Sequence, residues 1–306
     1  MKILVTGGAG FIGSHCVDTY LAAGHEVVIV DNLFTGHREN LNPNARFYEV
    51  DIRSKDLADV FAKEKPDVVA HYAAQMNVTL SLREPMLDAE INVLGTLNIL
   101  QNCVDHGAKR IIFSSTGGAI YGPDVPLPAP ETYDPRPISH YGNSKLCGEN
   151  YIRLYNAIYG LEFVILRFAN VYGPRQTPHG EAGVCAILGK LMLQDKQPIL
   201  FGFGTPLRDY VYVGDVARAN LLALSKGDGL AINLGTGKGT SVLEIYEAIK
   251  VHTPFKGEPN LQPLRPGEVQ EVYCANALAK GALGWSPEMP LAEGIAKTVE
   301  HLKHDA

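Results

Sequence analysis

Short apolar runs alternate with stretches of helical periodicity through the first half of the chain. Residues 3–5 are apolar but too few for a helix, so they predict a buried strand, and residues 14–23 have helical spacing. The other strand-like runs are residues 26–30, 46–50, 67–72, 110–114 and 162–168, and the helical stretches between them include 55–63, 87–104 and 141–159. This alternation predicts an α/β fold with a doubly wound parallel sheet.

The character of the sequence changes after residue 168. Residues 173–174, 202–206 and 261–267 have the composition of loops, and shorter helices are predicted at 182–194, 213–224, 241–251 and 291–301. We therefore predict a larger domain over residues 1–168 and a smaller, mixed α/β domain over residues 169–306. The boundary is soft, because segments of the second part can cross back to the sheet.

Glycines join the first predicted strand to the first predicted helix. Two overlapping spacings are present, one with Gly7 and one with Gly8, and both continue through Gly10 and Gly13. Glycine at these positions lets the backbone approach a pyrophosphate at the helix N-terminus, where a side chain would block it. The turn therefore predicts a Rossmann-type dinucleotide site.

An acidic residue closes the second predicted strand, as a dinucleotide site requires. Asp31 follows the apolar run 26–30 and can accept hydrogen bonds from an adenosine ribose 2′-hydroxyl. A carboxylate there would repel a 2′-phosphate, so NAD is favoured over NADP, although His37 and Arg38 nearby leave NADP open. The first domain is thus predicted to bind NAD.

Composition limits the class of protein further. The 306 residues, 46% of them hydrophobic, suit a globule with a substantial core, and no apolar run reaches the ~18 residues of a membrane span. The chain enters its first strand at once, without room for a signal peptide, and its five cysteines form no C-x-x-C pair, so we expect a cytoplasmic protein with reduced thiols. The ten histidines lack metal-ligand spacing and the net charge is −6, so neither a metal nor a nucleic-acid partner is expected.

Candidate reactive groups follow the fifth strand-like run and open a later helix. Ligands of such sheets bind beyond the carboxyl ends of the strands, where the hydroxyls of Ser114, Ser115 and Thr116 stand. Tyr141 and Lys145 are four residues apart, so they share one face of the predicted helix. A free phenol has a pKa near 10, and lowering it to about 7 takes roughly 4 kcal/mol, which a lysine cation and a nicotinamide cation can supply. Together these groups form a Ser/Thr, Tyr, Lys dehydrogenase site.

With these motifs in place, the sequence resembles the extended short-chain dehydrogenase/reductase family, and within it the nucleotide-sugar 4-epimerases. The resemblance runs nearly from end to end. It covers residues 6–13, 31–32, 51–52, 71–75, 92–96, 141–145, 170–176, 208–210 and 265–268. It implies an NAD-dependent isomerase acting on a nucleotide sugar, most simply a UDP-hexose.

The resemblance also implies a role for each matched residue. Tyr141 would be the general base, Lys145 would hold the nicotinamide ribose, and Thr116 would hydrogen-bond the sugar O4. Asp51 and Ile52 would contact adenine, and Ala73 and Ala74 would line the ribose side with Asn92 supporting them. The whole cofactor-binding set is Gly7, Gly10, Phe11, Ile12, Gly13, Asp31, Asn32, Asp51, Ile52, Ala73, Ala74, Asn92, Ser114, Tyr141 and Lys145. The substrate-binding set is Thr116, Tyr141, Asn170, Arg208, Arg265 and Glu268.

Two departures from the family pattern leave alternatives open. The segment 116–121 is one residue longer than in many relatives, so Ser115 rather than Thr116 can be the catalytic hydroxyl. Val272 stands where relatives often carry a tyrosine or cysteine that bounds the sugar pocket, and its modest side chain can admit a 2-acetamido sugar.

Other activities of the same fold remain to be separated. A 4-epimerase for UDP-N-acetylhexosamine, UDP-glucuronate or a UDP-pentose is the nearest alternative. A 4,6-dehydratase needs an acid/base pair after the catalytic threonine, where this chain has Gly117 and Gly118, and a non-catalytic NAD sensor would not need the catalytic set. The two long helices can pack within the monomer or on a second subunit, and the family favours a homodimer.

Overall fold

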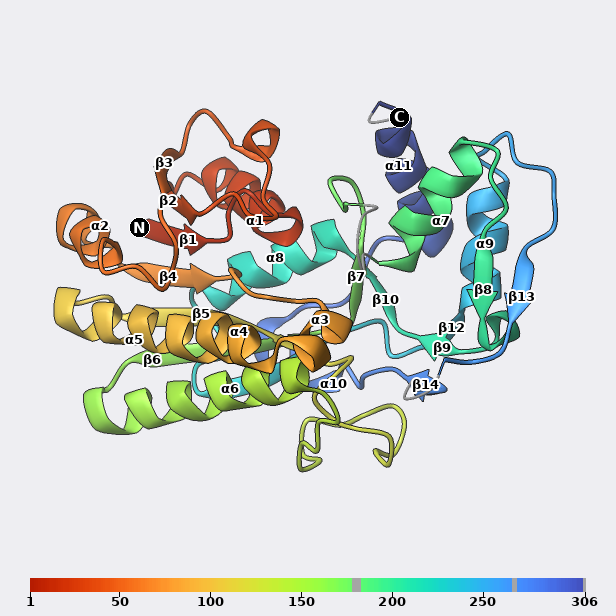
Figure 1. Cartoon of the computed structure of the whole chain (residues 1–306). Helices are drawn as coiled ribbons and strands as arrows, with labels where there is room; N and C mark the ends of the chain where they lie inside the picture. Colours follow the sequence, from red (N-terminus) through yellow and green to blue (C-terminus); the bar gives the residue numbers. More distant parts are fainter. Residues whose placement is uncertain (178–182, 266–268, 305–306) are drawn as a thin grey trace.

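A seven-stranded sheet forms the centre of the computed structural model, which describes residues 1–177, 183–265 and 269–304 (Figure 1). The strand order is β11-β6-β5-β4-β1-β2-β3, and every neighbouring pair is parallel. The strands are β1 (Lys2–Thr6), β2 (Glu26–Asp31), β3 (Arg46–Glu49), β4 (Val68–His71), β5 (Arg110–Thr116), β6 (Glu162–Phe168) and β11 (Leu230–Leu234). The chain starts in the middle of the sheet and builds outward on both sides, so the order reverses between β1 and β4, where such sheets bind ligands.

Helices cover both faces of this sheet. One face carries α2 (Leu57–Glu64), α5 (Gly95–His106) and α6 (His140–Tyr159), and the other carries α1 (Phe11–Ala22), α8 (Val213–Ala223) and α10 (Ala277–Leu283). Alternate side chains of β1 belong to the two cores: Leu4 to the first, Ile3 and Val5 to the second. The predicted doubly wound α/β fold is confirmed.

The predicted helix over 87–104 is longer and less regular than its periodicity suggests. The chain runs through α4 (Pro85–Ala89), a π-helical segment (Glu90–Leu94) and α5 without leaving the helical region. A further short helix, α3 (Val78–Arg83), precedes α4 and was not predicted; Asn77 caps it by accepting a hydrogen bond from the Leu80 amide. These pieces place the π-segment against α6.

The smaller part of the molecule contains short strands and three more helices (Figure 1). Its elements are β7 (Asn170–Tyr172), α7 (Val184–Leu193), β8 (Ile199–Phe201), β9 (Leu207–Arg208), β10 (Tyr210–Tyr212), β12 (Thr240–Ser241), α9 (Val242–Lys250), β13 (Asn260–Gln262), β14 (Glu271–Val272) and α11 (Leu291–His304). Two single 3₁₀ turns complete the described elements, Arg38–Asn40 and Gly202–Gly204. A separate core that includes Tyr172, Tyr246 and Ile295 holds this part together.

Residues after 168 also complete the main sheet. β11 pairs with β6 through the register Leu230↔Val164 to Leu234↔Phe168, and α8 packs on α1. The strand was not predicted because its apolar run is short and interrupted by Asn233, whose buried side chain accepts from Tyr121 and donates to Ala129 O. The main sheet therefore includes a strand from beyond residue 168. The division into domains at residues 168 and 169 stays a prediction.

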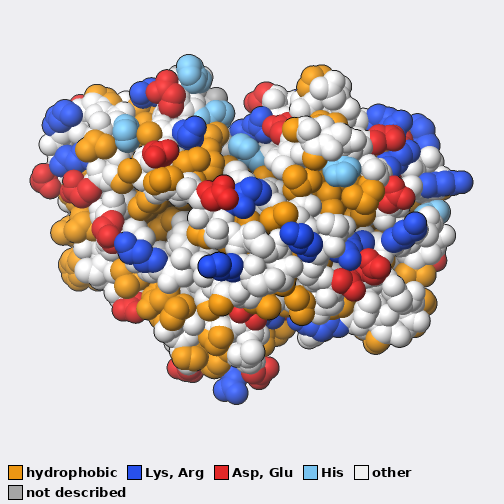
Figure 2. Space-filling model, turned by 180° about the vertical axis from the view of Figure 1, so that it is seen from behind, with side chains coloured by type: hydrophobic (Ala, Val, Ile, Leu, Met, Phe, Trp, Pro, Cys, Tyr) orange, Lys and Arg blue, Asp and Glu red, His pale blue; other side chains and the backbone are white. Residues whose placement is uncertain are grey.

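The surface shows no concentration of one charge on the face opposite to that of Figure 1. Figure 2 shows basic and acidic side chains scattered over that face, in keeping with the modest net charge of −6. Among the helices of residues 1–177, 183–265 and 269–304, none combines the length and apolar character needed to span a bilayer.

Candidate active site

The glycine turn forms a tight cradle between β1 and α1. Gly7 adopts φ +72°, and its N–H donates to Val30 O at 2.9 Å. A Cβ on Gly7 would lie 2.6 Å from the Ala73 backbone nitrogen, and one on Gly13 would lie 2.1 Å from Gly7 O. Gly10 is the N-cap of α1, which Phe11 and Ile12 begin, and no side chain caps it. This helix N-terminus is therefore built for a close anionic group.

Asp31 is held in a fixed orientation beside this cradle. Its carboxylate accepts hydrogen bonds from the backbone amides of Ala9 (3.0 Å) and Leu33 (2.8 Å). Burial raises the pKa of Asp31, and these two hydrogen bonds oppose the rise. Two backbone amides therefore fix the orientation of this carboxylate at the end of β2, where it can accept further hydrogen bonds.

The predicted adenine-contacting residues have different surroundings. Arg53 donates two side-chain hydrogen bonds to Asp51, which brings the pKa of Asp51 to about 2, and Asn32 donates to the same carboxylate at 2.8 Å. Ile52 is buried, and a Cβ on Gly95 would lie 2.6 Å from its Cδ1. The structure therefore joins Asn32 to Asp51 and places the side chain of Ile52 in the core beneath them.

Hydrogen bonds hold the segment after β4 that contains Ala73 and Ala74. Ala73 and Ala74 are half-buried after β4, and the Ala73 amide donates to Thr6 Oγ1 at 3.3 Å. Asn92, in the π-segment, binds both the amide and the carbonyl of Gln75 and donates to Ser144 Oγ. Asn92 thereby ties this segment to α6.

A buried histidine that the sequence did not single out supports the same segment. His71 lies between the hydroxyls of Thr6 (2.8 Å) and Thr96 (3.0 Å), and burial lowers its pKa to about 3. It is therefore neutral and acts as a link in a hydrogen-bond chain.

The catalytic candidates meet where β5 ends against α6. The Thr116 hydroxyl lies near enough to the Tyr141 phenol to lower its pKa, and Lys145 Nζ donates to Ser114 O at 2.8 Å. Ser115 instead donates to Glu149 Oε1 at 2.7 Å. The structure therefore brings Thr116, not Ser115, to the phenol, and leaves the assignment of roles as a proposal.

Burial changes the acidity of both ionisable candidates. It raises the pKa of Tyr141 to about 12, against the effect of the Thr116 hydroxyl, and lowers the pKa of Lys145 to about 8. The ammonium of Lys145 lies 4.9 Å from the Phe113 ring centroid. Bringing the phenol from about 12 to about 7 takes about 7 kcal/mol, more than the ~4 kcal/mol expected from a free phenol, because the apolar surroundings penalise the phenolate.

The residues predicted to bind the diphosphate have different surroundings in the structure. Asn170 is the first residue of β7, and its backbone N–H donates to Asp209 O at 2.8 Å. Arg208 donates to the carbonyls of Val269 (2.7 Å) and Gln270 (3.2 Å). Arg265 is exposed, with its guanidinium 4.7 Å from the Phe201 ring centroid. Glu268 lies outside the described residues.

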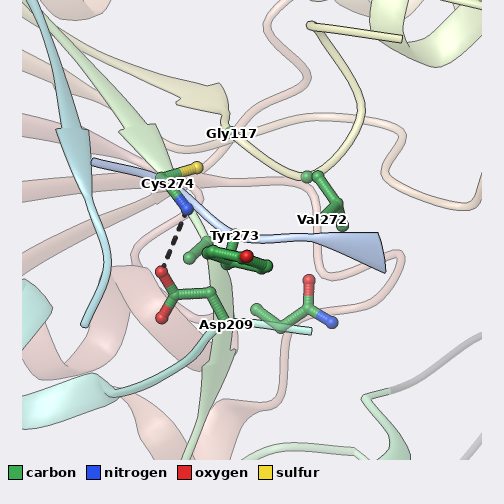
Figure 3. A pocket seen from close by; sticks show the side chains of 8 residues that line it. Gly117, Asp209, Val272, Tyr273 and Cys274 are labelled. Atoms are coloured by element: carbon green, nitrogen blue, oxygen red, sulfur yellow. Dashed lines mark hydrogen bonds between the residues drawn. The ribbon is translucent and has the colours of Figure 1, made fainter. Parts of the chain in front are cut away.

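A small depression opens beside these residues. Its lining comprises Gly117, Gly118, Ala169, Asn170, Asp209, Val272, Tyr273 and Cys274 (Figure 3). A Cβ on Gly118 would lie 3.9 Å from Thr116 Oγ1, so the depression begins next to the catalytic hydroxyl candidate.

A buried ion pair between Glu149 and Arg167 was not predicted, although the spacing of Glu149 from Lys145 is visible in the sequence. Glu149 follows Lys145 by four residues and so lies on the same face of α6. Arg167 donates to both of its oxygens, at 2.9 and 2.7 Å, and both side chains are buried. Among residues 1–177, 183–265 and 269–304, no group of three or more acidic, histidine or cysteine side chains is arranged to hold a metal ion.

Comparison with known proteins adds to this geometry. The model of the NAD dependent epimerase/dehydratase family matches residues 3–235. The chain belongs to this family. The resemblance found in the motifs is thereby confirmed.

Three similar proteins cover essentially the whole chain. A UDP-glucose 4-epimerase of Mycolicibacterium smegmatis is 41% identical over 310 residues, 99% of each chain. The crystal structure of a UDP-glucose 4-epimerase from Thermotoga maritima with UDP-glucose is 48% identical, with a TM-score of 0.97 over 100% of this chain and 99% of that one. The UDP-glucose 4-epimerase of Thermus thermophilus in complex with NAD is 44% identical, with a TM-score of 0.92 over 100% of both chains.

Proposed function

We propose that this protein interconverts UDP-galactose and UDP-glucose by transient oxidation at sugar C4, with NAD as cofactor and Tyr141 as general base. The observation that carries the proposal is that Tyr141 and Lys145, one turn apart on α6, meet the carboxyl end of β5, where Lys145 Nζ donates to Ser114 O and the Thr116 hydroxyl lies near the phenol. The family and the full-length similarity to UDP-glucose 4-epimerases support the same activity. The enzyme would belong to galactose metabolism.

The residues present fit NAD. The Gly7 to Gly13 turn leaves no space for side chains where the backbone approaches, and the Asp31 carboxylate is aimed by two backbone amides, which suits a ribose hydroxyl and repels a 2′-phosphate. When bound, NAD supplies a reversible acceptor for the C4 hydrogen of the sugar and its electrons. Asp51 with Asn32, the backbone near Ile52, Ala73 and Ala74 would complete the pocket, with Asn92 behind them.

Three side chains would carry out the proton chemistry. Tyr141 takes the proton of the sugar 4-hydroxyl and returns it, and Thr116 donates a hydrogen bond to O4. Lys145, anchored through Ser114 O, holds a positive charge on the same face of α6 as the phenol. Because burial favours the neutral phenol, Tyr141 becomes a base only when positive charge near it outweighs desolvation.

The sugar nucleotide would be held by its diphosphate rather than by its sugar. Asn170, Arg208 and Arg265 are suited to diphosphate oxygens, since guanidinium groups bind them through two parallel hydrogen bonds, and Glu268 would bind the nucleotide ribose. A ring that is loosely held can present both faces to the cofactor, and binding energy is best placed on the part that does not react.

The first test is conversion of separate sugar nucleotides by the purified protein with NAD, followed by proton NMR at the anomeric position. We expect UDP-galactose to give UDP-glucose without net NADH, and NADP to be a poor substitute. Val272 is small and buried at the edge of the depression, so UDP-N-acetylgalactosamine should also be converted, and the same assay with UDP-glucuronate tests the uronate alternative. If none of the three sugars reacts, the UDP-hexose activity is wrong.

A homodimer through α5 and α6 is the proposed assembly. Leu94, which ends the π-segment before α5, is 57% exposed, and Leu154 and Ile158 on α6 are 48% and 59% exposed, so this side of the molecule carries apolar side chains that a second copy can cover. Light scattering should give twice the mass of one chain, and Leu154→Glu should shift it toward one. A wild-type monomer at micromolar concentration would disprove the assembly.

A cytoplasmic location is proposed on the state of the thiols. All five cysteines are unpaired, and four of them are buried. Free thiols suit a reducing compartment. Fractionation of cells that produce the protein should find it with the cytoplasmic fraction, and recovery with membranes or the medium would refute this.

A further inference from the structure

Asp209 joins three segments of the chain that are far apart in sequence. Its carboxylate is 2% exposed and accepts four hydrogen bonds. Oδ1 accepts from the amide and the hydroxyl of Thr236, at 2.7 and 2.6 Å, and Oδ2 accepts from the amides of Gly237 and Cys274, both at 3.2 Å. Figure 3 shows the bond to Cys274.

The segment that Asp209 holds is one wall of the depression beside Thr116. Val272, Tyr273 and Cys274 form that wall, and Gly117 and Gly118, which follow Thr116 in the chain, also line the depression (Figure 3). The depression begins next to the Thr116 hydroxyl, and under the proposed function we take it as the place of the sugar.

Gly117 and Cys274 are packed without spare room, since a Cβ on Gly117 would lie 2.6 Å from Cys274 Sγ. Asp209 is packed as tightly, since a Cβ on Gly235 would lie 2.3 Å from its Oδ2. A shift of a few tenths of an ångström in the segment 272–274 therefore changes the width of the depression.

Backbone contacts also hold this segment. Val272 pairs with Arg208 where β14 meets β9, the Tyr273 carbonyl accepts from the Ala129 amide, and Arg208 binds the carbonyls of Val269 and Gln270 before it. The bond to Asp209 adds a side-chain anchor for the Cys274 backbone at the turn between β9 and β10.

We propose that Asp209 is a positioning residue that fixes the segment 272–274 relative to Thr116 and thereby determines how large a sugar substituent the site admits. The inference rests on the proposed function in taking the depression as the sugar site. A carboxylate is required because all four partners are donors, and a carboxylate accepts at both oxygens and donates at neither. In Asp209→Asn one oxygen becomes an NH₂ group that faces N–H donors.

A matched control is available elsewhere in the chain. Asp215 is also a buried carboxylate that accepts from two backbone amides, those of Glu288 and Met289, both at 3.0 Å. It does not line the depression. Asp215→Asn therefore reports what the loss of such a carboxylate does to the fold without disturbing the 272–274 wall.

The first readout is independent of activity and uses the cysteines as reporters. Cys16, Cys103, Cys185 and Cys274 are all buried, each at most 1% exposed. In Asp209→Asn, we expect the rate of alkylation at Cys274, followed by peptide mass spectrometry, to rise about tenfold or more while the other three rates are unchanged. A parallel rise at all four would mean general loosening, and no rise at Cys274 would mean that the wall does not depend on Asp209; either result overturns the inference.

The second readout separates positioning from chemistry. In Asp209→Asn we expect the KM for UDP-galactose to rise about tenfold, with kcat within about threefold and NAD affinity unchanged, and the preference to shift toward UDP-N-acetylgalactosamine. Asp215→Asn should leave KM and preference unchanged. An unaltered KM and preference in Asp209→Asn would contradict the proposal.

Two provisions keep the outcomes distinct. If Asp209→Asn does not fold, Thr236→Val removes only the hydroxyl donor and should give smaller changes in the same direction, and no change there overturns the inference. If the wild-type protein converts no nucleotide sugar, the proposed function fails, while the alkylation rates still decide whether Asp209 holds the wall.

Discussion

Replacing Tyr141 with phenylalanine should lower kcat by about 10³-fold or more while the protein still binds NAD. The substitution removes one oxygen, which is the proposed base and lies near the Thr116 hydroxyl. General acid–base catalysis contributes about 10²–10⁴-fold, and the proposed mechanism has Tyr141 as its single general base. The measurement is turnover of UDP-galactose together with NAD binding by fluorescence titration.

Tyr155 on the same helix supplies the control for this result. Its hydroxyl donates to Gln101 of α5 in an exposed contact, so Tyr155→Phe should leave both kcat and NAD binding unchanged. If Tyr141→Phe keeps more than a tenth of wild-type turnover, the base is another group. Full loss of NAD binding would show instead that the variant disturbs the cofactor pocket.

The second large effect concerns stability. Arg167→Met should lower the free energy of unfolding by about 3–5 kcal/mol, because it leaves the buried Glu149 carboxylate without its main partner. Arg167 also donates to the hydroxyl of Tyr121 at 2.9 Å, which loses that bond. Urea denaturation at pH 7 measures the change.

The pH dependence of this deficit has a definite sign. Burial by itself raises the pKa of Glu149, but the hydrogen bonds and charge of Arg167 hold it below its usual value. The pair therefore stabilises the wild type fully above about pH 4.3, the ordinary glutamate pKa, and the contribution fades as the pH falls below it. In Arg167→Met, burial raises the pKa of Glu149, so this carboxylate protonates more readily. The difference in free energy of unfolding between the wild type and the variant should therefore become smaller as the pH is lowered from 7 to 5.

An exposed ion pair provides the comparison for the buried one. Lys303 and Glu300 are paired at 2.8 Å near the end of α11, with side chains 45% and 62% exposed. Lys303→Met should leave the urea midpoint nearly unchanged, because water screens an exposed pair. Equal effects of Arg167→Met and Lys303→Met would mean that the buried pair adds nothing beyond a surface contact.

Local features of this site could be predicted because their parts are close in sequence. The Gly7 to Gly13 turn and Asp31 are set by a strand, a turn and a helix within about thirty residues. Likewise, Tyr141 and Lys145 share a face of α6 because they are four residues apart. The π-segment around Asn92 was not predicted, since it continues the apolar periodicity of the helices on either side.

The sequence by itself determined the alternation of strands and helices, the dinucleotide turn and the phenol–ammonium pair, because hydrophobic period and short-range spacing decide these. Only the tertiary structure decided which of two adjacent hydroxyls meets the phenol: Ser115 and Thr116 contact residues two helical turns apart on α6, and their partners depend on how that helix packs on β5. The same holds for Asp209 and Cys274, which are 65 residues apart. Such contacts arise from the packing of several layers, and no local pattern in the chain encodes them.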